Sequence, residues 1–575
     1  MDVMSPFKSR ALACAISLLS FCTAGTAVAG PIPIDALAQF ESVTNVVLSP
    51  DGKHVVGLVA APGQKWPVIS IWKADALEQT ATWIPSQNMR PTRVGFLGNE
   101  RVWFIAEQEI NRGSVKTFTR KLYTTDLKGK EFDEPLKRGG STNDAVRNAE
   151  STGITVNVFN DMLNDKESIL LERSDIGQGG IQQVYRYDAD RDQATLIGEG
   201  TEKAFFIPGG VNLATGELLI QEKIGLAEGE AAALGTYWVM RYIRRNAKSP
   251  WELHPALSYP LKQRRTIEIE GFDTDPNKLL VVTNVGSNFT RVMNYDIAAK
   301  KFDAEPLFQN EKYDIAGVMF GRDPATDSVI GVEGVQVAGP AVEPVFVDDF
   351  WRPTFASLKR QFPGQQLALY SRQAKAGRAI LSVESDGNPP TFYLVNTAPK
   401  LSLAKIGSER PWIDPKTLGQ TRWVTYKARD GLEVPAILTL PPGWTPDKGR
   451  IPAVINPHGG PWARDYLGWD SSGWTQFLAT RGYAVLRPQY RGSDGLGLQL
   501  WLAGDENWGL KMQDDKDDGA QWLVDQGIAD PRKIAIFGYS YGGFAAIAAS
   551  VRPNGPYVCA LAGAGVSSLA LIQHE

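Results

Sequence analysis

The feature that most restricts the fold is a long region, from about residue 40 to about residue 410, in which short apolar or aromatic runs alternate with turn-forming pairs. Asp51-Gly52 stands before the run at 55–58, and Asp386-Gly387 stands before the run at 392–395. Asp-Gly pairs favour tight turns, whereas β-branched and aromatic residues favour strands. Many short strands with regular turns suit a propeller, a sandwich or several small β domains. About 370 residues are too many for one β-sandwich, and at four strands per blade they favour a propeller of about seven or eight blades.

A different pattern begins near residue 415. Strands are expected at 422–426, 434–440, 451–456, 483–486, 533–537 and 558–562, and helices at 509–526 and 544–551. Strands that alternate with helices predict a parallel, doubly wound sheet. The chain is therefore expected to hold an all-β propeller domain over residues 30–414 and a partial α/β domain over residues 415–575.

The first 29 residues have the pattern of an export signal. Lys8 and Arg10 begin it, residues 11–24 are almost wholly apolar or small, and Ala27-Val28-Ala29 supplies a small-x-small cleavage site. The apolar run is short for a spanning helix. We expect residues 1–29 to be removed and the protein to be periplasmic or secreted, without stable membrane association. An uncleaved N-terminal anchor is the alternative.

Charge and cysteine content narrow the possible classes of protein further. Lys plus Arg is 60 and Asp plus Glu is 64, a near balance that argues against a nucleic-acid partner. The three cysteines include two in the signal, so the mature chain would keep only Cys559 and form no internal disulfide. We expect Cys559, inside an apolar run, to be a buried small hydrophobe.

One motif predicts the chemistry. Gly538-Tyr539-Ser540-Tyr541-Gly542 matches G-x-S-x-G between an expected strand and an expected helix, which is the context of a nucleophile elbow. The candidate nucleophile is Ser540. Acyl transfer also needs two donors aimed at the oxyanion. The amide of Tyr541 is one, and Gly459 or Gly460, in the His-Gly-Gly loop after the strand at 451–456, supplies the other.

Three further groups have two interpretations each. His458 precedes the serine, against the order of the hydrolase triad, so we favour a loop-shaping side chain over a general base. Arg491, in the loop 490–497, is either a substrate contact or the partner of a neighbouring acid. The charged run 514–518 is expected to be a solvated helix face rather than a metal site.

Together these segments resemble the prolyl-oligopeptidase family of serine peptidases, especially its acylaminoacyl-peptidase and dipeptidyl-peptidase-like branch. The resemblance implies an α/β-hydrolase domain capped by a propeller that admits short peptides, and acyl-enzyme chemistry without metal or organic cofactor. The segments that carry it are His458-Gly459-Gly460-Pro461, Tyr490-Arg491-Gly492-Ser493, Asn507-Trp508-Gly509, Ala529-Asp530-Pro531 and Gly538–Phe544.

The chain departs from the family after the serine. Of the 35 residues that follow Ser540, one is a histidine, His574, none is an aspartate, and the only acid is Glu575. We expect the triad Asp and His to lie beyond residue 575, the given chain to be truncated and nearly inactive, and the strand at 558–562 to be an exposed apolar edge. An exported esterase and a non-catalytic propeller-based binding protein are the alternatives. Cleavage preference, the choice among endo-, dipeptidyl- and acylaminoacyl-type cleavage, and oligomeric state stay open.

Overall fold

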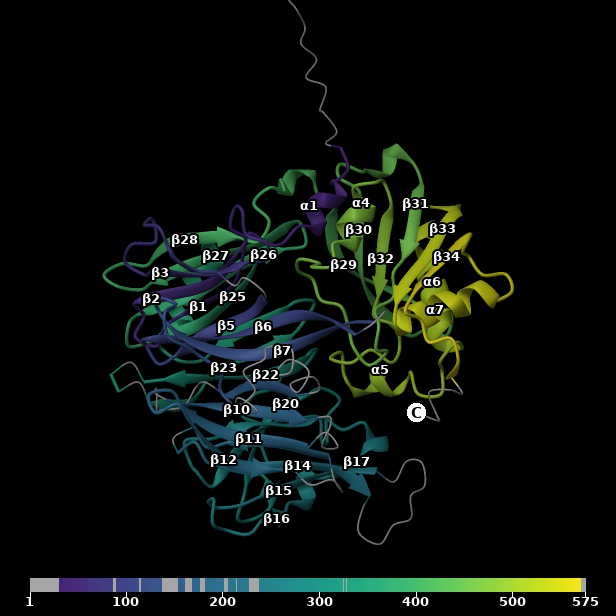
Figure 1. Ribbon diagram of the computed structural model, residues 1–575. Helices are drawn as coiled ribbons and strands as arrows, with labels where there is room; N and C mark the ends of the chain where they lie inside the picture. The colour runs from purple at the N-terminus through teal and green to yellow at the C-terminus, as the bar shows by residue number, and fades with distance from the viewer. Residues whose placement is uncertain are drawn as a thin grey trace, which may run out of the picture.

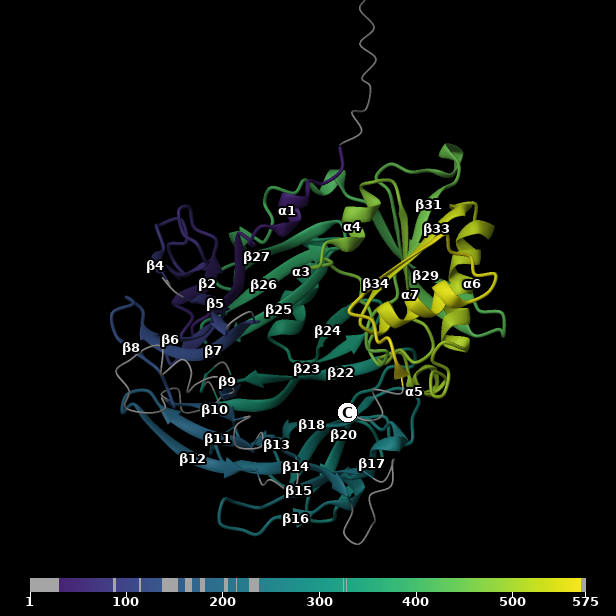
Figure 2. The same ribbon diagram turned by 45° about the vertical axis from the view of Figure 1, so that its right-hand side comes forward.

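The computed structural model describes residues 30–569 except for short internal stretches, and shows a β-rich body beside an α/β body (Figures 1 and 2). The expected signal, with Cys14 and Cys22, and the C-terminal His574 lie outside the described residues. The internal stretches without description are 86–88, 113–114, 137–153, 161–167, 176–180, 201–204, 214, 227–236, 324 and 327.

The β-rich body is a seven-bladed propeller, so the lower of the two expected blade counts is correct. Within the described residues its strands form seven antiparallel sheets. The first four are β1 (Val43–Leu48), β2 (His54–Val59), β3 (Val68–Lys73), β4 (Thr82–Ile84); β5 (Arg90–Leu97), β6 (Arg101–Arg112), β7 (Val115–Asp126), β8 (Phe132–Asp133); β9 (Ile154–Asn160), β10 (Ser168–Asp175), β11 (Ile181–Asp188), β12 (Gln193–Glu199); and β13 (Phe205–Val211), β14 (Leu218–Leu226), β15 (Tyr237–Ile243), β16 (Glu252–Leu253), β17 (Tyr259–Pro260). The last three are β18 (Ile267–Phe272), β19 (Lys278–Thr283), β20 (Arg291–Asp296), β21 (Lys301–Phe302); β22 (Asp314–Arg322), β23 (Val329–Ala338), β24 (Val342–Phe346); and β25 (Gln366–Gln373), β26 (Arg378–Ser385), β27 (Asn388–Asn396), β28 (Ser402–Ser408).

Buried apolar side chains between neighbouring blades hold the propeller together. Val56 of the first blade packs with Phe104 of the second, while Val55, on the other face of the same strand, packs with Ile380 and Leu394 of the seventh. Because alternate residues of a strand point to opposite faces, each blade covers both of its neighbours. The contact between the first and seventh blades closes the ring. An inserted helix, α3 (Trp351–Gln361), precedes the seventh blade.

The α/β body is a six-stranded mixed sheet in the order β29-β30-β32-β31-β33-β34. The expected parallel arrangement is correct for the last four strands of this order, whereas β29 and β30 are antiparallel. Each expected strand and helix is present, with small changes of boundary. The elements are β29 (Gln420–Lys427), β30 (Glu433–Leu440), β31 (Ile451–Ile455), α4 (Trp474–Ala479), β32 (Ala484–Pro488), α5 (Leu498–Leu502), α6 (Lys511–Asp525), β33 (Ala529–Tyr539), α7 (Tyr541–Val551) and β34 (Cys559–Gly563).

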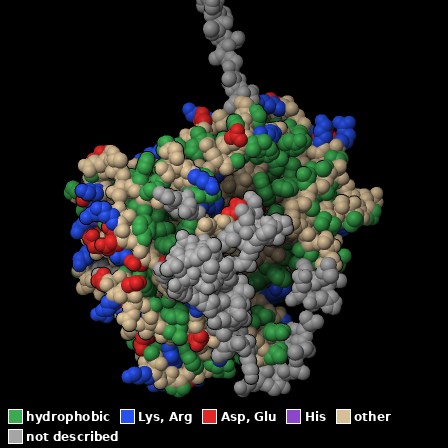
Figure 3. Space-filling model, viewed as in Figure 1, with side chains coloured by type: hydrophobic (Ala, Val, Ile, Leu, Met, Phe, Trp, Pro, Cys, Tyr) green, Lys and Arg blue, Asp and Glu red, His purple; other side chains and the backbone are tan. Residues whose placement is uncertain are grey.

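Helices cover the two faces of this sheet unequally. Ile455 and Ile536 point toward α6 and α7 and form the main core of the domain with Leu523. On the opposite face, α4 covers only part of the sheet and borders an apolar pocket of about 670 Å³. Figure 3 shows hydrophobic side chains gathered over this part of the sheet. No described helix is long and apolar enough to span a membrane.

The two bodies dock through loops of the α/β body. The carboxylate of Asp386, in the propeller, accepts a hydrogen bond from the backbone N–H of Gly468 (3.2 Å) and forms an ion pair with Arg487 (3.4 Å). The carboxylate of Asp314, in β22, accepts from the backbone N–H of Gly497 (2.8 Å). Beside this junction, the short helix α1 (Ile34–Ala38) accepts a hydrogen bond from the Arg410 guanidinium through the backbone carbonyl of Leu37. The propeller therefore lies against the loops that carry Arg491 and the oxyanion residues.

Strand β34 is the exposed apolar edge that the sequence predicts. Among the described strands it pairs only with β33, and its residues are exposed along most of its length. The expectation that Cys559 is buried is wrong, because this strand lies at the end of the sheet and its thiol is exposed. Unpaired backbone groups beside apolar side chains favour intermolecular strand pairing.

We expect Leu561→Lys to lower self-association of the 575-residue chain, because a charge on an edge strand opposes pairing. Leu561 is 51% exposed, so the substitution should leave the free energy of unfolding nearly unchanged. Light scattering at increasing protein concentration measures the effect. Leu510→Lys is the matched control, since Leu510 is 60% exposed and lies outside the strands. Equal scattering of the two variants would contradict the prediction.

Candidate functional site

Ser540 lies at a strained turn between β33 and α7. Its backbone has φ 57° and ψ −121°, a conformation that a non-glycine residue adopts only where the surrounding structure enforces it. The turn is tight on both sides: a Cβ on Gly538 would lie 2.3 Å from the carbonyl oxygen of Gly542, and a Cβ on Gly542 would lie 2.3 Å from that of Pro457. Only glycine fits at these two positions, so the motif has a steric cause.

This turn brings the candidate oxyanion donors beside Ser540, the candidate nucleophile. Tyr541 is the first residue of α7, so its backbone N–H belongs to the set that a helix leaves without an intrahelical partner. A Cβ placed on Gly459 would lie 3.3 Å from Cβ of Ser540, which puts the Gly459 backbone next to the serine. Gly460, with φ 121°, turns the chain away immediately afterwards. The arrangement can receive a carbonyl oxygen next to a serine hydroxyl.

His458 is held within its own loop. Its Nε2 lies 2.9 Å from Oγ of Ser493, its Nδ1 lies 2.8 Å from the carbonyl oxygen of Gly459, and its ring stacks on Tyr490 with the centroids 4.4 Å apart. Burial lowers the pKa of His458. Both ring nitrogens are thus engaged away from Ser540, a geometry that favours the loop-shaping interpretation.

We expect Gly542→Ala to destabilise the protein by about 2 kcal/mol or more, because its methyl group would overlap the Pro457 carbonyl and push the elbow and the oxyanion loop apart. Urea denaturation measures the change. Gly555→Ala is the control, since its nearest neighbour would lie at an ordinary 3.6 Å. A Gly542→Ala protein as stable as the Gly555→Ala protein would refute the steric argument.

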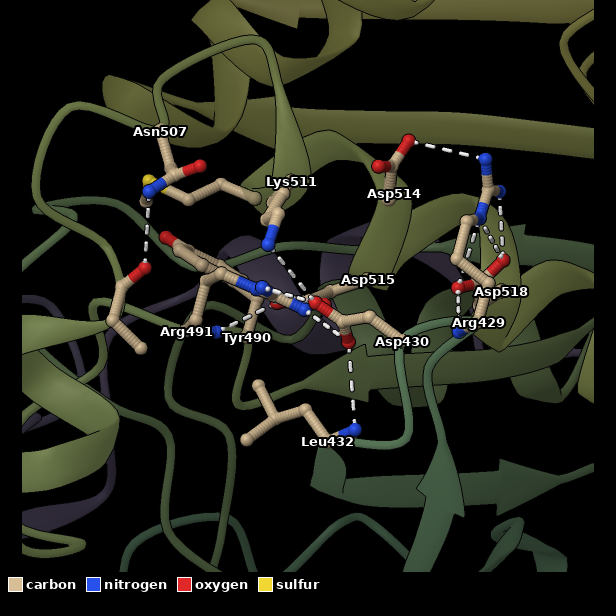
Figure 4. Close-up of polar contacts among 12 residues, drawn as sticks. Arg429, Asp430, Leu432, Tyr490, Arg491, Asn507, Lys511, Asp514, Asp515 and Asp518 are labelled. Carbon is tan, nitrogen blue, oxygen red and sulfur yellow. Dashed lines mark hydrogen bonds and ion pairs between the residues drawn. The ribbon is translucent and has the colours of Figure 1, made fainter.

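Arg491 lies in a buried ion network rather than in an open cleft (Figure 4). It is 4% exposed, and its guanidinium forms paired hydrogen bonds with Asp515 of α6 and with Asp430 of the turn after β29. Its guanidinium holds the pKa of Asp430 well below the usual range. Burial raises the pKa of Asp515, and the bonds from Arg491 oppose that rise. This geometry favours the paired-acid interpretation over a substrate contact.

The charged run 514–518 is not the solvated helix face that its composition predicts. Asp515 and Lys516 are both fully buried, and Asp517 pairs with Arg552 (2.8 Å). The outer member Asp518 binds Arg429 (2.7 Å), as Figure 4 shows. The prediction failed because arginines from distant segments cover this face of α6. The described residues contain no group of His, Cys, Asp or Glu that could hold a metal ion.

An aromatic cluster that sequence reasoning missed supports the elbow. The buried ring of Tyr541 packs on Trp508 (4.7 Å between centroids), on Tyr490 (5.5 Å) and on Phe544 (5.6 Å). Its phenol contacts Sδ of Met512 (3.6 Å). These contacts fix the side chain of Tyr541 and thereby the orientation of its backbone amide. The motif Asn507-Trp508-Gly509 is the sequence signal that could have pointed to this role.

A catalytic base for Ser540 is not among the described histidines. His254 bonds Tyr295 inside the propeller (2.9 Å), His458 bonds Ser493, and His54 lies in β2. Within the described residues, then, the site consists of Ser540 as the candidate nucleophile and the candidate oxyanion donors. His574, which the sequence disfavours as the base, lies outside the described part of the chain.

Comparison with known proteins identifies relatives of this chain. The model of the prolyl oligopeptidase family matches residues 469–574. Dipeptidyl aminopeptidase BIII of Pseudoxanthomonas mexicana is 26% identical over 545 residues, which cover 93% of this chain and 72% of that enzyme. Dipeptidyl peptidase family member 6 of Caenorhabditis elegans is 32% identical over 226 residues, which cover 36% of this chain and 30% of that protein. The solved acylaminoacyl peptidase of Pyrococcus horikoshii shares the fold, with a TM-score of 0.58, 14% identity and coverage of 92% of this chain and 78% of its own.

Proposed function

The chain belongs to the prolyl oligopeptidase family of serine peptidases, and on that premise we propose that the protein hydrolyses short peptides through an acyl-enzyme on Ser540. The observation that carries the proposal is the strained Ser540 at the end of β33, with the Gly459 backbone against its side chain. Such strain at a turn is maintained by the surrounding structure and is typical of active sites. The propeller beside this site supports a restriction to short or unfolded peptides.

The proposed reaction begins when Oγ of Ser540 attacks the carbonyl carbon of a peptide bond, while its proton passes to a base. The π electrons of the carbonyl move to the oxygen, which accepts hydrogen bonds from the Tyr541 amide and from the amide of Gly459 or Gly460. Collapse of this intermediate breaks the C–N bond, and the amine leaves with the proton. Water then attacks the ester by the same route and frees Ser540.

We further propose that this chemistry needs an acid and a base other than the described residues, which supply neither to Ser540. A serine without its base is a weak nucleophile, so residues 30–569 alone should hydrolyse peptides only slightly. The relatives include dipeptidyl and acylaminoacyl peptidases, and both fit a site of this kind. Export to the periplasm or medium, with removal of residues 1–29, is part of the proposal and rests on the signal pattern.

Phosphonate labelling of the natural protein at its full length tests the proposed function. We expect a fluorophosphonate to attach to Ser540, as located by peptide mass spectrometry, and the labelled protein to lose hydrolysis of short peptide amides. An exported esterase would hydrolyse p-nitrophenyl esters and leave peptide amides intact. A binding protein would take up no label. Either result would refute the peptidase proposal.

A further inference from the structure

Lys516 is a buried cation that the proposed mechanism does not use. Its side chain is 0% exposed, in the middle of α6. No carboxylate oxygen of the described residues lies within 4.0 Å of its Nζ, because the neighbouring carboxylates turn away: Asp515 binds Arg491 and Asp517 binds Arg552. An isolated buried ammonium is costly unless other groups stabilise it.

The groups that do contact this ammonium belong to the elbow. Its Nζ donates a hydrogen bond to the backbone carbonyl of Met512 (2.7 Å) and lies over two aromatic rings, 3.5 Å from the centroid of Tyr490 and 5.3 Å from that of Tyr541. A cation over an aromatic face is attracted by the electron density of the ring, and more strongly where water is excluded. The ammonium is therefore held by the two tyrosines.

These two tyrosines support the two sides of the oxyanion site. Tyr541 itself carries one candidate donor, its backbone amide. Tyr490 donates its phenolic hydrogen bond to the backbone carbonyl of His458 (2.8 Å), the residue directly before Gly459, which carries the other. The buried ammonium of Lys516 thus contacts the two tyrosines that hold the two candidate oxyanion donors.

We propose that Lys516 is a positioning residue of the oxyanion site: its ammonium holds Tyr490 and Tyr541 in place and adds positive potential on the buried side of the Tyr541 amide. The proposal rests on the proposed function, since it concerns the same acyl transfer. A positive charge in a region without water interacts with a developing oxyanion more strongly than a charge in solvent.

The surroundings of Lys516 also predict a pH dependence. Burial lowers its pKa to about 7, and the nearby Arg491 acts in the same direction, whereas Asp515 and Asp517 oppose it. The facing phenols of Tyr490 and Tyr541 stay neutral, because burial raises the pKa of both. Lys516 is protonated below this pKa and neutral above it. Its contribution to the oxyanion site should therefore decrease as the pH rises through about 7.

The test compares Lys516→Met with wild type in the natural full-length protein. The measured quantity is the second-order rate constant for fluorophosphonate labelling of Ser540 from pH 5.5 to 9, and thermal unfolding is followed in parallel. Methionine keeps the length of the side chain and removes the charge. We expect about tenfold slower labelling at pH 6, an unfolding temperature equal to or above that of wild type, and loss of the decline in rate above pH about 7. Lys511→Met, at a 58% exposed position of the same helix, is the matched control and should label as wild type does.

The possible outcomes distinguish failure of this inference from failure of the proposed function. Labelling of Lys516→Met at the wild-type rate, with an unchanged pH profile, would overturn the positioning role and leave the peptidase intact. Slower labelling in parallel with a lower unfolding temperature and an unchanged pH profile would also overturn it, because a purely structural lysine behaves that way. Wild-type protein that takes no label would overturn the proposed function and this inference with it.

Discussion

Replacing Ser540 with alanine should leave the natural protein folded and abolish peptide hydrolysis. Loss of the nucleophile in serine peptidases lowers kcat by roughly a millionfold, and the remainder comes from the oxyanion donors and from substrate binding. Ser540 is only partly exposed and its backbone conformation is set by neighbouring glycines, so removal of one hydroxyl should change packing little. Hydrolysis of short peptide amides and labelling by fluorophosphonate measure the effect together.

Ser540→Gly provides the matched control for this result. It removes the same hydroxyl, and glycine also adopts φ 57° without steric cost. We expect the Gly variant to be as inactive as the Ala variant but more stable by about 1 kcal/mol in urea denaturation, which is the strain that Ser540 carries. A Ser540→Ala protein that kept its activity would show that the nucleophile lies elsewhere.

Replacing Arg491 with methionine should destabilise the protein by about 3 to 5 kcal/mol. Asp515 is 0% exposed, and its carboxylate takes its hydrogen bonds from the Arg491 backbone and guanidinium. Methionine has the length to fill the space but leaves this charge buried without compensation. Such a loss is much larger than the effect of a surface ion pair, and urea denaturation at neutral pH measures it.

Arg429→Met is the control for that experiment. Arg429 pairs with Asp514 and Asp518 on the same helix, but its side chain is 54% exposed, so we expect a loss below about 1 kcal/mol. The larger effect should shrink in mild acid, because burial raises the pKa of Asp515 and, without the opposing bonds from Arg491, protonation removes the uncompensated charge. If Arg491→Met raised KM without loss of stability, the substrate-contact interpretation would replace the structural one.

The sequence by itself determined the features that depend on local chemistry. Turn pairs such as Asp51-Gly52 and the apolar runs after them predicted the propeller, because tight turns and strand alternation are properties of a few adjacent residues. The glycines around Ser540 predicted the elbow for the same reason: the steric demand on Gly538 and Gly542 arises within one strand-turn-helix unit.

Only the tertiary structure decided which charged and polar groups are buried. The run 514–518 has the composition of an exposed face, and yet Asp515 and Lys516 are fully buried, because Arg491 and the ring of Tyr490 come from a segment about 24 residues earlier in the chain. Cys559 shows the converse, an apolar run that lies at an exposed sheet edge. Periodicity indicates which residues of one element share a face, but it contains no information on what packs against that face. Burial, ion pairing and the environment of Lys516 are set by contacts between distant segments, and these exist only once the chain has folded.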